Sequence, residues 1–163
     1  MYTIIRAALI CAITVLLASC SPLTLNNVDF GWPVESVVTV GNDNMIQERR
    51  YGLALNVAGL ATEEFADSNA LKRASLRVLR SQEGYYYITG RQFKHVYVLK
   101  PGAAELVAKS KIKVGEHGLH NPALNLRPPH VVLLDENGVR VYLDSDDVVK
   151  NPRGELAKGE NNE

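Results

Sequence analysis

The stretch HVVLLDENGVRVYL, residues 130–143, decides the fold class. Its two halves are rich in apolar and β-branched residues, and they flank an Asp-Glu-Asn-Gly tetrapeptide. Asn-Gly between two apolar runs is the strongest short-range signal for a β-hairpin. A second hairpin is predicted upstream, where residues 76–80 (LRVLR) and 85–89 (YYYIT) flank Gln-Glu-Gly. The sequence therefore predicts antiparallel strands joined by tight turns.

Further strands are predicted around this second hairpin. Residues 104–114 alternate, with Ala, Leu, Ala, Ser, Ile and Val on one face and Glu, Val and three lysines on the other. That period of two predicts a strand with one face on a core and one face in water. Residues 93–99 form another candidate strand, followed by a Lys-Pro-Gly turn. Near the start of the domain, residues 35–40 and 51–57 are predicted to pair as a third hairpin around the turn residues Gly-Asn-Asp-Asn.

About eight short strands predict an all-β domain, either a small antiparallel β-sandwich or a partly open barrel. The pattern leaves both alternatives open. The strands fall within residues 35–150, and the run Thr62-Glu63-Glu64-Phe65, a capping residue followed by acids, favours one short helix. Residues 151–163 are polar and lack β-branched and aromatic residues, so they are predicted to be a disordered tail.

The first 19 residues have the composition of a secretory signal helix rather than of a domain. They carry one charge, Arg6, followed by an apolar run from Ala7 to Ala18. A transmembrane helix needs about 20 apolar residues, whereas a signal peptide needs about 7–15 after a basic start. Residues 1–19 are therefore expected to be absent from the folded domain.

The residues that end this run, Leu17-Ala18-Ser19-Cys20, resemble the lipobox of bacterial lipoprotein precursors. The resemblance implies cleavage before Cys20, a diacylglyceryl group on its sulfur and acylation of the new amino terminus. Since Ser21 replaces the aspartate that often retains such proteins in the inner membrane, it also implies the outer membrane, facing the periplasm. Residues 20–34 would then be the lipidated cysteine and a tether. The alternative is an uncleaved anchor that ends in an ordinary cysteine.

The two cysteines of the chain then contribute nothing to the chemistry of the domain. Cys11 leaves with the signal peptide and Cys20 carries the lipid. The mature domain has no thiol left for a disulfide, a metal or a nucleophilic role.

Charge sums to zero over the chain, with 18 basic and 18 acidic residues, but it is unevenly placed. Residues 72–113 carry ten bases and two acids, whereas the segments on both sides are acidic. Overall neutrality gives no reason to expect nucleic acid. Lys109, Lys111 and Lys113 would project from one strand face, where they could bind an anionic lipid, an anionic glycan or an acidic protein. Alternatively, the lysines keep that face solvated and discourage edge-to-edge pairing, or the acidic segments fold back over it.

The four histidines lie between residues 95 and 130, so His117, His120 and His130 are weak candidates for metal ligands. Zinc needs three or four ligands in a fixed tetrahedral array, and a glycine-containing loop without cysteine supplies no such spacing. The acids of residues 144–147 suit calcium, but they also suit a turn. The sequence therefore predicts no bound metal or other cofactor.

Catalytic motifs are absent from the sequence: there is no GxSxG, no phosphate-binding glycine loop and no HExxH. The expectation is a lipid-anchored bacterial envelope protein, held to the membrane through Cys20, whose non-catalytic β domain binds or scaffolds another envelope component. The alternative is a periplasmic small-ligand or metal-binding module that uses the Gly115–His130 loop.

Overall fold

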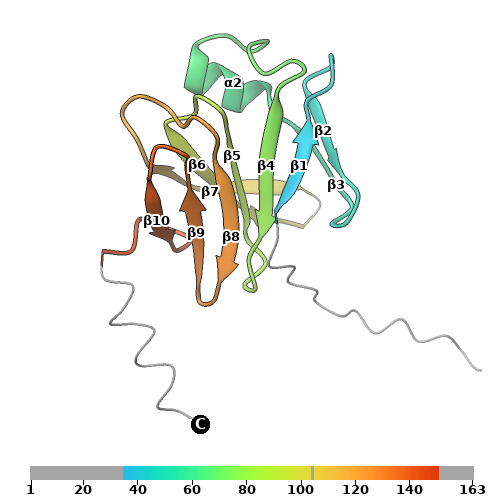
Figure 1. The fold of residues 1–163 in the computed structure, drawn as a ribbon. Helices are drawn as coiled ribbons and strands as arrows, with labels where there is room; N and C mark the ends of the chain where they lie inside the picture. The colour runs from blue at the N-terminus through green and yellow to red at the C-terminus, as the bar shows by residue number, and fades with distance from the viewer. Residues whose placement is uncertain (1–34, 104, 151–163) are drawn as a thin grey trace, which may run out of the picture.

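A computed structural model describes residues 35–103 and 105–150 (Figure 1). This part of the chain contains ten strands and one helix, two strands more than predicted. In chain order the elements are β1 (Ser36–Thr39), β2 (Met45–Glu48), β3 (Leu53–Asn56), α2 (Ala58–Phe65), β4 (Ser75–Arg80), β5 (Tyr86–Gly90), β6 (His95–Pro101), β7 (Leu106–Lys113), β8 (Ala123–Arg127), β9 (His130–Leu134) and β10 (Arg140–Leu143).

A five-stranded antiparallel sheet, in the order β1-β4-β5-β6-β7, forms the middle layer of the domain. The three-stranded sheet β10-β9-β8 covers one of its faces, and the β2-β3 hairpin and α2 cover the other (Figure 1). None of these sheets closes on itself within the described residues. The fold is therefore all-β and sandwich-like, which resolves the alternative of a partly open barrel.

Two separate hydrophobic cores lie on the two faces of the middle sheet. The core under α2 and the β2-β3 hairpin includes Ile46, Ile88 and Phe93, each with no exposed surface. The core between the two larger sheets includes Tyr87 and Leu133. Every residue of β5 is buried, because successive side chains of a strand point alternately into the two cores.

Both hairpins with clear turn residues are confirmed. Strands β4 and β5 pair antiparallel, as do β9 and β10. At the second turn the N–H of Gly138 donates to the carbonyl of Asp135, and Gly138 has a φ of 79°. An Asn-Gly turn requires this left-handed conformation, which glycine adopts without strain.

The third predicted hairpin is wrong. Residues 36–39 do not pair with residues 53–56; β1 pairs with β4, and β3 pairs with β2. The sequence reading missed β2, whose inward-facing residues are Ile46 and Glu48. A glutamate on the inner face breaks the apolar alternation, and it is tolerated because Ser36 and Arg50 donate hydrogen bonds to its carboxylate.

The short helix is present but starts earlier than the sequence suggests. It begins at Ala58, and Thr62 lies in its interior, where its hydroxyl donates to the carbonyl of Ala58. The side chain of Asn56 accepts a hydrogen bond from the N–H of Ala58 and so satisfies one free donor of the first turn. Ala66, at a φ of 58°, ends the helix.

The predicted signal helix, the lipobox cysteine Cys20, the tether to residue 34 and the polar tail from residue 151 lie outside the described residues. Among the residues that are described, no helix has the length and apolar character needed to cross a membrane.

Candidate functional site

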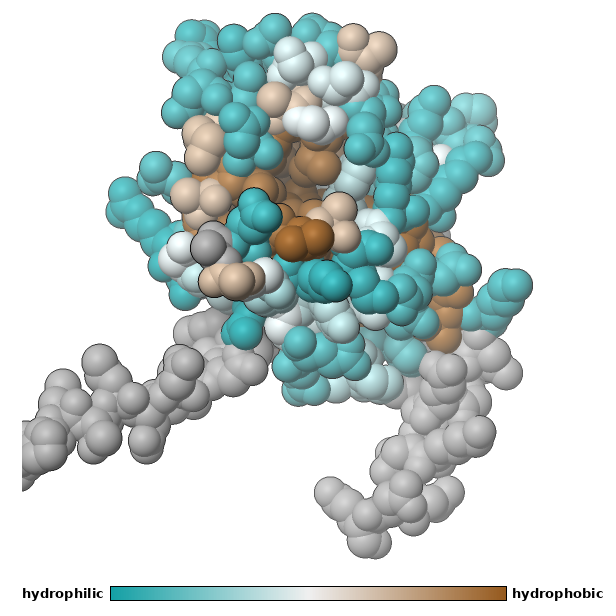
Figure 2. Space-filling view, turned by 180° about the vertical axis from the view of Figure 1, so that it is seen from behind, coloured by the Kyte–Doolittle hydropathy of each residue, from teal (hydrophilic) through white to brown (hydrophobic). Residues whose placement is uncertain are grey.

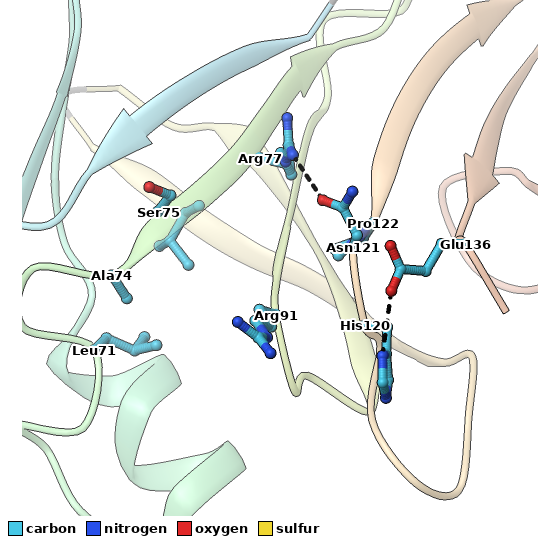
Figure 3. A pocket seen from close by; sticks show the side chains of 10 residues that line it. Leu71, Ala74, Ser75, Arg77, Arg91, His120, Asn121, Pro122 and Glu136 are labelled. Carbon is cyan, nitrogen blue, oxygen red and sulfur yellow. Dashed lines mark hydrogen bonds and ion pairs between the residues drawn. The ribbon is translucent and has the colours of Figure 1, made fainter.

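A cavity of about 500 Å³ opens at one end of the sandwich, where loops from both larger sheets meet (Figure 3). It draws on β4 and the loop before it, the β5-β6 turn, the loop before β8 and the β9-β10 turn. One part of its wall is apolar and the rest is polar or charged, as is usual in ligand-binding cavities. Its lining residues are Leu71, Ala74, Ser75, Leu76, Arg77, Arg91, His120, Asn121, Pro122 and Glu136.

The polar wall is built around an ion pair between Arg77 on β4 and Glu35. The guanidinium Nη1 lies 2.8 Å from one carboxylate oxygen, and the other oxygen accepts the N–H of Leu124 at 2.7 Å. Arg77 Nη2 also donates to the side-chain oxygen of Asn121 at 3.2 Å. Burial raises the pKa of Glu35, and this outweighs the lowering by the Leu124 N–H and the Arg77 guanidinium. This network fixes Arg77 in place and joins the two larger sheets.

The loop before β8 is held by backbone hydrogen bonds at the edge of the cavity. The buried carboxylate of Asp135 accepts the N–H groups of His120 and Asn121, the latter at 2.7 Å. The N–H of Gln92 donates to the carbonyl of Leu119 at 2.7 Å, which ties the loop to the β5-β6 turn. The loop therefore presents its side chains from a fixed backbone.

Three charged or titratable side chains face the open part of the cavity. Arg91 extends into it from the β5-β6 turn, as Figure 3 shows, and it makes no hydrogen bond or ion pair with any residue that the structure describes. Across from it, Nδ1 of His120 lies 3.3 Å from the carboxylate of Glu136, and both side chains are more than half exposed. The arrangement can bind a ligand through Arg91 and shield an apolar group against Leu71 and Leu76.

The predicted lysine stripe on β7 is not formed as one face. Val98 pairs with Ser110 and Leu99 with Ala108, so Lys109 is the extra residue of a β-bulge. A bulge re-aims the side chains around it. Lys109 therefore contacts Asp146 after β10, whereas Lys111 lies over the ring of Tyr97 on the α2 side of the sheet.

All three lysines are in ion pairs with carboxylates from the acidic segments. Lys109 pairs with Asp146, Lys111 with Glu63 of α2 at 2.8 Å, and Lys113 with Glu116 at 2.7 Å. The carboxylates of these pairs come from both acidic segments that flank residues 72–113 in the sequence.

The candidate metal ligands His117, His120 and His130 do not come together. His130 is buried, and its ring packs edge-on against Tyr142. His120 lies at the cavity and His117 is exposed in its loop. Within the described residues there is no group of three or more His, Cys, Asp or Glu that could hold a metal ion.

The acids of residues 144–147 are used in a turn. One oxygen of Asp144 accepts the N–H groups of Asp146 and Asp147, both at 2.7 Å. Asp147 in turn accepts the N–H of Val148. This corresponds to the turn alternative for this acidic run.

A second hollow of about 500 Å³ lies between β3 and the β6-β7 turn. Figure 2 shows apolar side chains gathered on this back side of the molecule. Leu53, Leu55 and Leu106 line the hollow beside Tyr51, and Glu105 is its one charged lining residue. Since the one charged side chain of this hollow is an acid, whereas the cavity around Arg91 combines arginines, an acid and an apolar wall, that cavity is the better candidate site.

Sequence reasoning missed a polar cluster that joins α2 to β6. The carboxylate of Glu64 is only 1% exposed, and it accepts hydrogen bonds from the N–H of Lys94, from Nδ1 of His95 and from the hydroxyl of Tyr97, at 2.7–2.8 Å. Burial and the neighbouring Glu64 carboxylate raise the pKa of Tyr97. The sequence signal for this cluster is Glu64, an acidic residue at a helix position that has to be buried.

Comparison of the chain with protein-family models, with curated proteins and with solved structures finds no match.

Proposed function

We propose that this protein is a lipid-anchored envelope protein whose β domain binds another envelope component at the cavity around Arg91, without catalysis. The anchoring half rests on the lipobox-like residues Leu17 to Cys20. The cavity carries the binding half, because it combines a fixed polar wall, an apolar wall and an arginine that has no partner among the described residues.

The lining supports binding more than hydrolysis. Glu136 is its one carboxylate, whereas glycoside hydrolysis needs two that flank the bond to be broken. The sequence suggests a binding site for an anionic lipid or glycan on β7, at Lys109, Lys111 and Lys113. In the structure, each of these lysines is paired with a carboxylate. We therefore place the binding site at the cavity and not on β7.

The anchoring half is tested on the mature amino terminus. Mass spectrometry of the purified protein should find Cys20 as the first residue with two or three acyl chains, which would hold the protein in the membrane because each buried methylene contributes about 0.8 kcal/mol. Cys20→Ser should leave the precursor uncleaved, and Cys11→Ser serves as the matched control that should not change processing. An unmodified Cys20, or an intact leader on the wild-type protein, would overturn this half.

The binding half is tested by photo-crosslinking in living cells. A crosslinking amino acid at position 136 should capture a partner, and the same residue at position 107, on exposed Val107 of β7, should not. Equal capture from both positions, or capture from neither, would overturn the binding half.

The small-ligand alternative also has an observation in its favour, since His120, Asn121 and Pro122 of the Gly115–His130 loop line the cavity. Native mass spectrometry of freshly purified protein separates the two: a retained small molecule favours the alternative, and crosslinking to a macromolecule favours the main proposal. Metal analysis, with His117→Ala and His120→Ala as controls, tests the metal version.

A further inference from the structure

We infer that the cavity recognises a single carboxylate joined to an apolar group, and that Arg91 holds the carboxylate. The inference rests on the proposed function, because it assumes that this cavity is the binding site and specifies the chemistry of its ligand.

Arg91 is suited to this role by its donors and by its position. A guanidinium presents planar N–H groups that match the two oxygens of a carboxylate, and charge-assisted hydrogen bonds are the stronger ones. The backbone next to it is constrained: Gln92 has a φ of 65°, unusual for a residue other than glycine, and is held by the carbonyl of Leu119. Such conformations are found where neighbouring structure enforces them, often at ligand sites.

The charges around the cavity allow one negative charge and not two. The charge of Arg77 is already balanced by Glu35 at 2.8 Å. Glu136 adds a carboxylate to the rim, close to His120. Arg91 is then the one arginine of the lining whose charge is unbalanced within the described residues. A phosphate monoester carries about −1.5 to −2 at neutral pH, so it would leave part of its charge uncompensated beside Glu136.

The opposite part of the wall is apolar. Leu71 and Ala74 line the side of the cavity away from Glu136 (Figure 3), next to the fully buried Leu76, and Pro122 adds apolar surface beside Asn121. A hydrocarbon group that lies against them loses its contact with water, which is favourable by about 25 cal/mol per Å². A ligand with both parts satisfies both walls of the cavity.

The test uses three six-carbon probes with different polar groups: hexanoate, hexyl phosphate and hexanol. Each is titrated into the ¹⁵N-labelled protein, and the amide resonances of residues 71–77, 91, 120 and 121 report binding. We expect hexanoate to bind about tenfold or more tightly than hexanol, because a hydrogen bond to a charged group contributes about 1.5–3 kcal/mol. Hexyl phosphate should bind more weakly than hexanoate.

Variants then assign the carboxylate contact. Arg91→Gln should weaken hexanoate binding by about tenfold or more and leave hexanol binding unchanged. Arg127→Gln is the matched control, because Arg127 is exposed at the other end of β8 and does not line the cavity. Unchanged amide spectra away from the cavity would show that both variants fold.

The inference is overturned if hexanol binds as well as hexanoate, if hexyl phosphate binds best, or if Arg91→Gln binds hexanoate like the wild type. Each of these results is compatible with crosslinking of a partner from position 136, so the proposed function would survive it. Conversely, Arg91-dependent hexanoate binding without any crosslinked partner would support the ligand chemistry and refute the macromolecular partner.

Discussion

Replacing Glu64 with alanine should destabilise the domain far more than the same change at the neighbouring Glu63. The side chain is 1% exposed and its carboxylate accepts three hydrogen bonds, two from β6 and one from Lys94 just before it, so the substitution removes the acceptor of all three at once. Two of the donors, the ring of His95 and the hydroxyl of Tyr97, belong to side chains that lie between the helix and the sheet.

The size of the effect follows from these contacts. A hydrogen bond to a charged group contributes about 1.5–3 kcal/mol, and a buried donor left without an acceptor costs about 1–3 kcal/mol. His95 is 21% exposed, so water can replace part of its bond. We expect a loss of about 3 kcal/mol in the free energy of unfolding, equivalent to roughly 10 °C in Tm for a domain of this size.

Urea unfolding followed by circular dichroism measures this loss. Glu63→Ala is the matched control, because Glu63 is the preceding residue and its side chain is 53% exposed in an ion pair with Lys111. Exposed ion pairs contribute about 0–1 kcal/mol, so this variant should remain close to the wild type. If the two variants lost the same stability, or if Glu64→Ala lost less than about 1 kcal/mol, the hydrogen bonds from β6 would not hold the helix as argued.

Three further variants test other contacts. Burial raises the pKa of Glu48, but hydrogen bonds from a serine hydroxyl, a backbone N–H and Arg50 outweigh it and hold that pKa below its usual 4.5. The advantage of the wild type over Glu48→Gln in urea unfolding should therefore be complete above about pH 4.5 and disappear as the pH falls through the lowered pKa; an advantage independent of pH would contradict this. Gly118→Ala should lower the unfolding free energy by about 1–3 kcal/mol, because Gly118 has a φ of 80° and a Cβ would lie 2.7 Å from the carbonyl oxygen of Gln92; thermal unfolding like that of the wild type would refute it. Phe93→Ala should cost about 3–5 kcal/mol, since this ring is fully buried; a loss below about 1 kcal/mol would show that it is not packed as described.

The hairpins could be predicted from sequence because their signals are local. A turn such as the one at Gly138 needs only the few residues that form it. Pairing between β1 and β4 joins residues about forty positions apart, Val38 with Leu76 for example, and no local pattern contains it. From the sequence, residues 35–40 are paired with residues 51–57, the next predicted strand, because local signals cannot look past the intervening hairpin and helix.

The candidate site was less predictable than the fold. The alternation in residues 104–114 is real, but the bulge at Lys109 depends on how β7 pairs with β6 and is invisible in β7 alone. Arg91 and Glu136 lie in turns, where charged residues usually face water. Only the fold brings these two turns to the same cavity as the loop of His120. The sequence predicts a small-ligand or metal-binding role for that loop, but nothing in it indicates an anionic ligand.

The burial of β5 on both faces determines how this domain can open. Since Ile88 packs into one core and Tyr87 into the other, separating either covering layer exposes a face of the same strand. Its amide protons should therefore be among the slowest to exchange with solvent, and they should exchange only when most of the domain unfolds. The cavity, in contrast, opens at the loop end of the two sheets. A ligand that enters there, as we propose, need not separate either covering layer from the central strand, so the stability of the whole domain remains undisturbed.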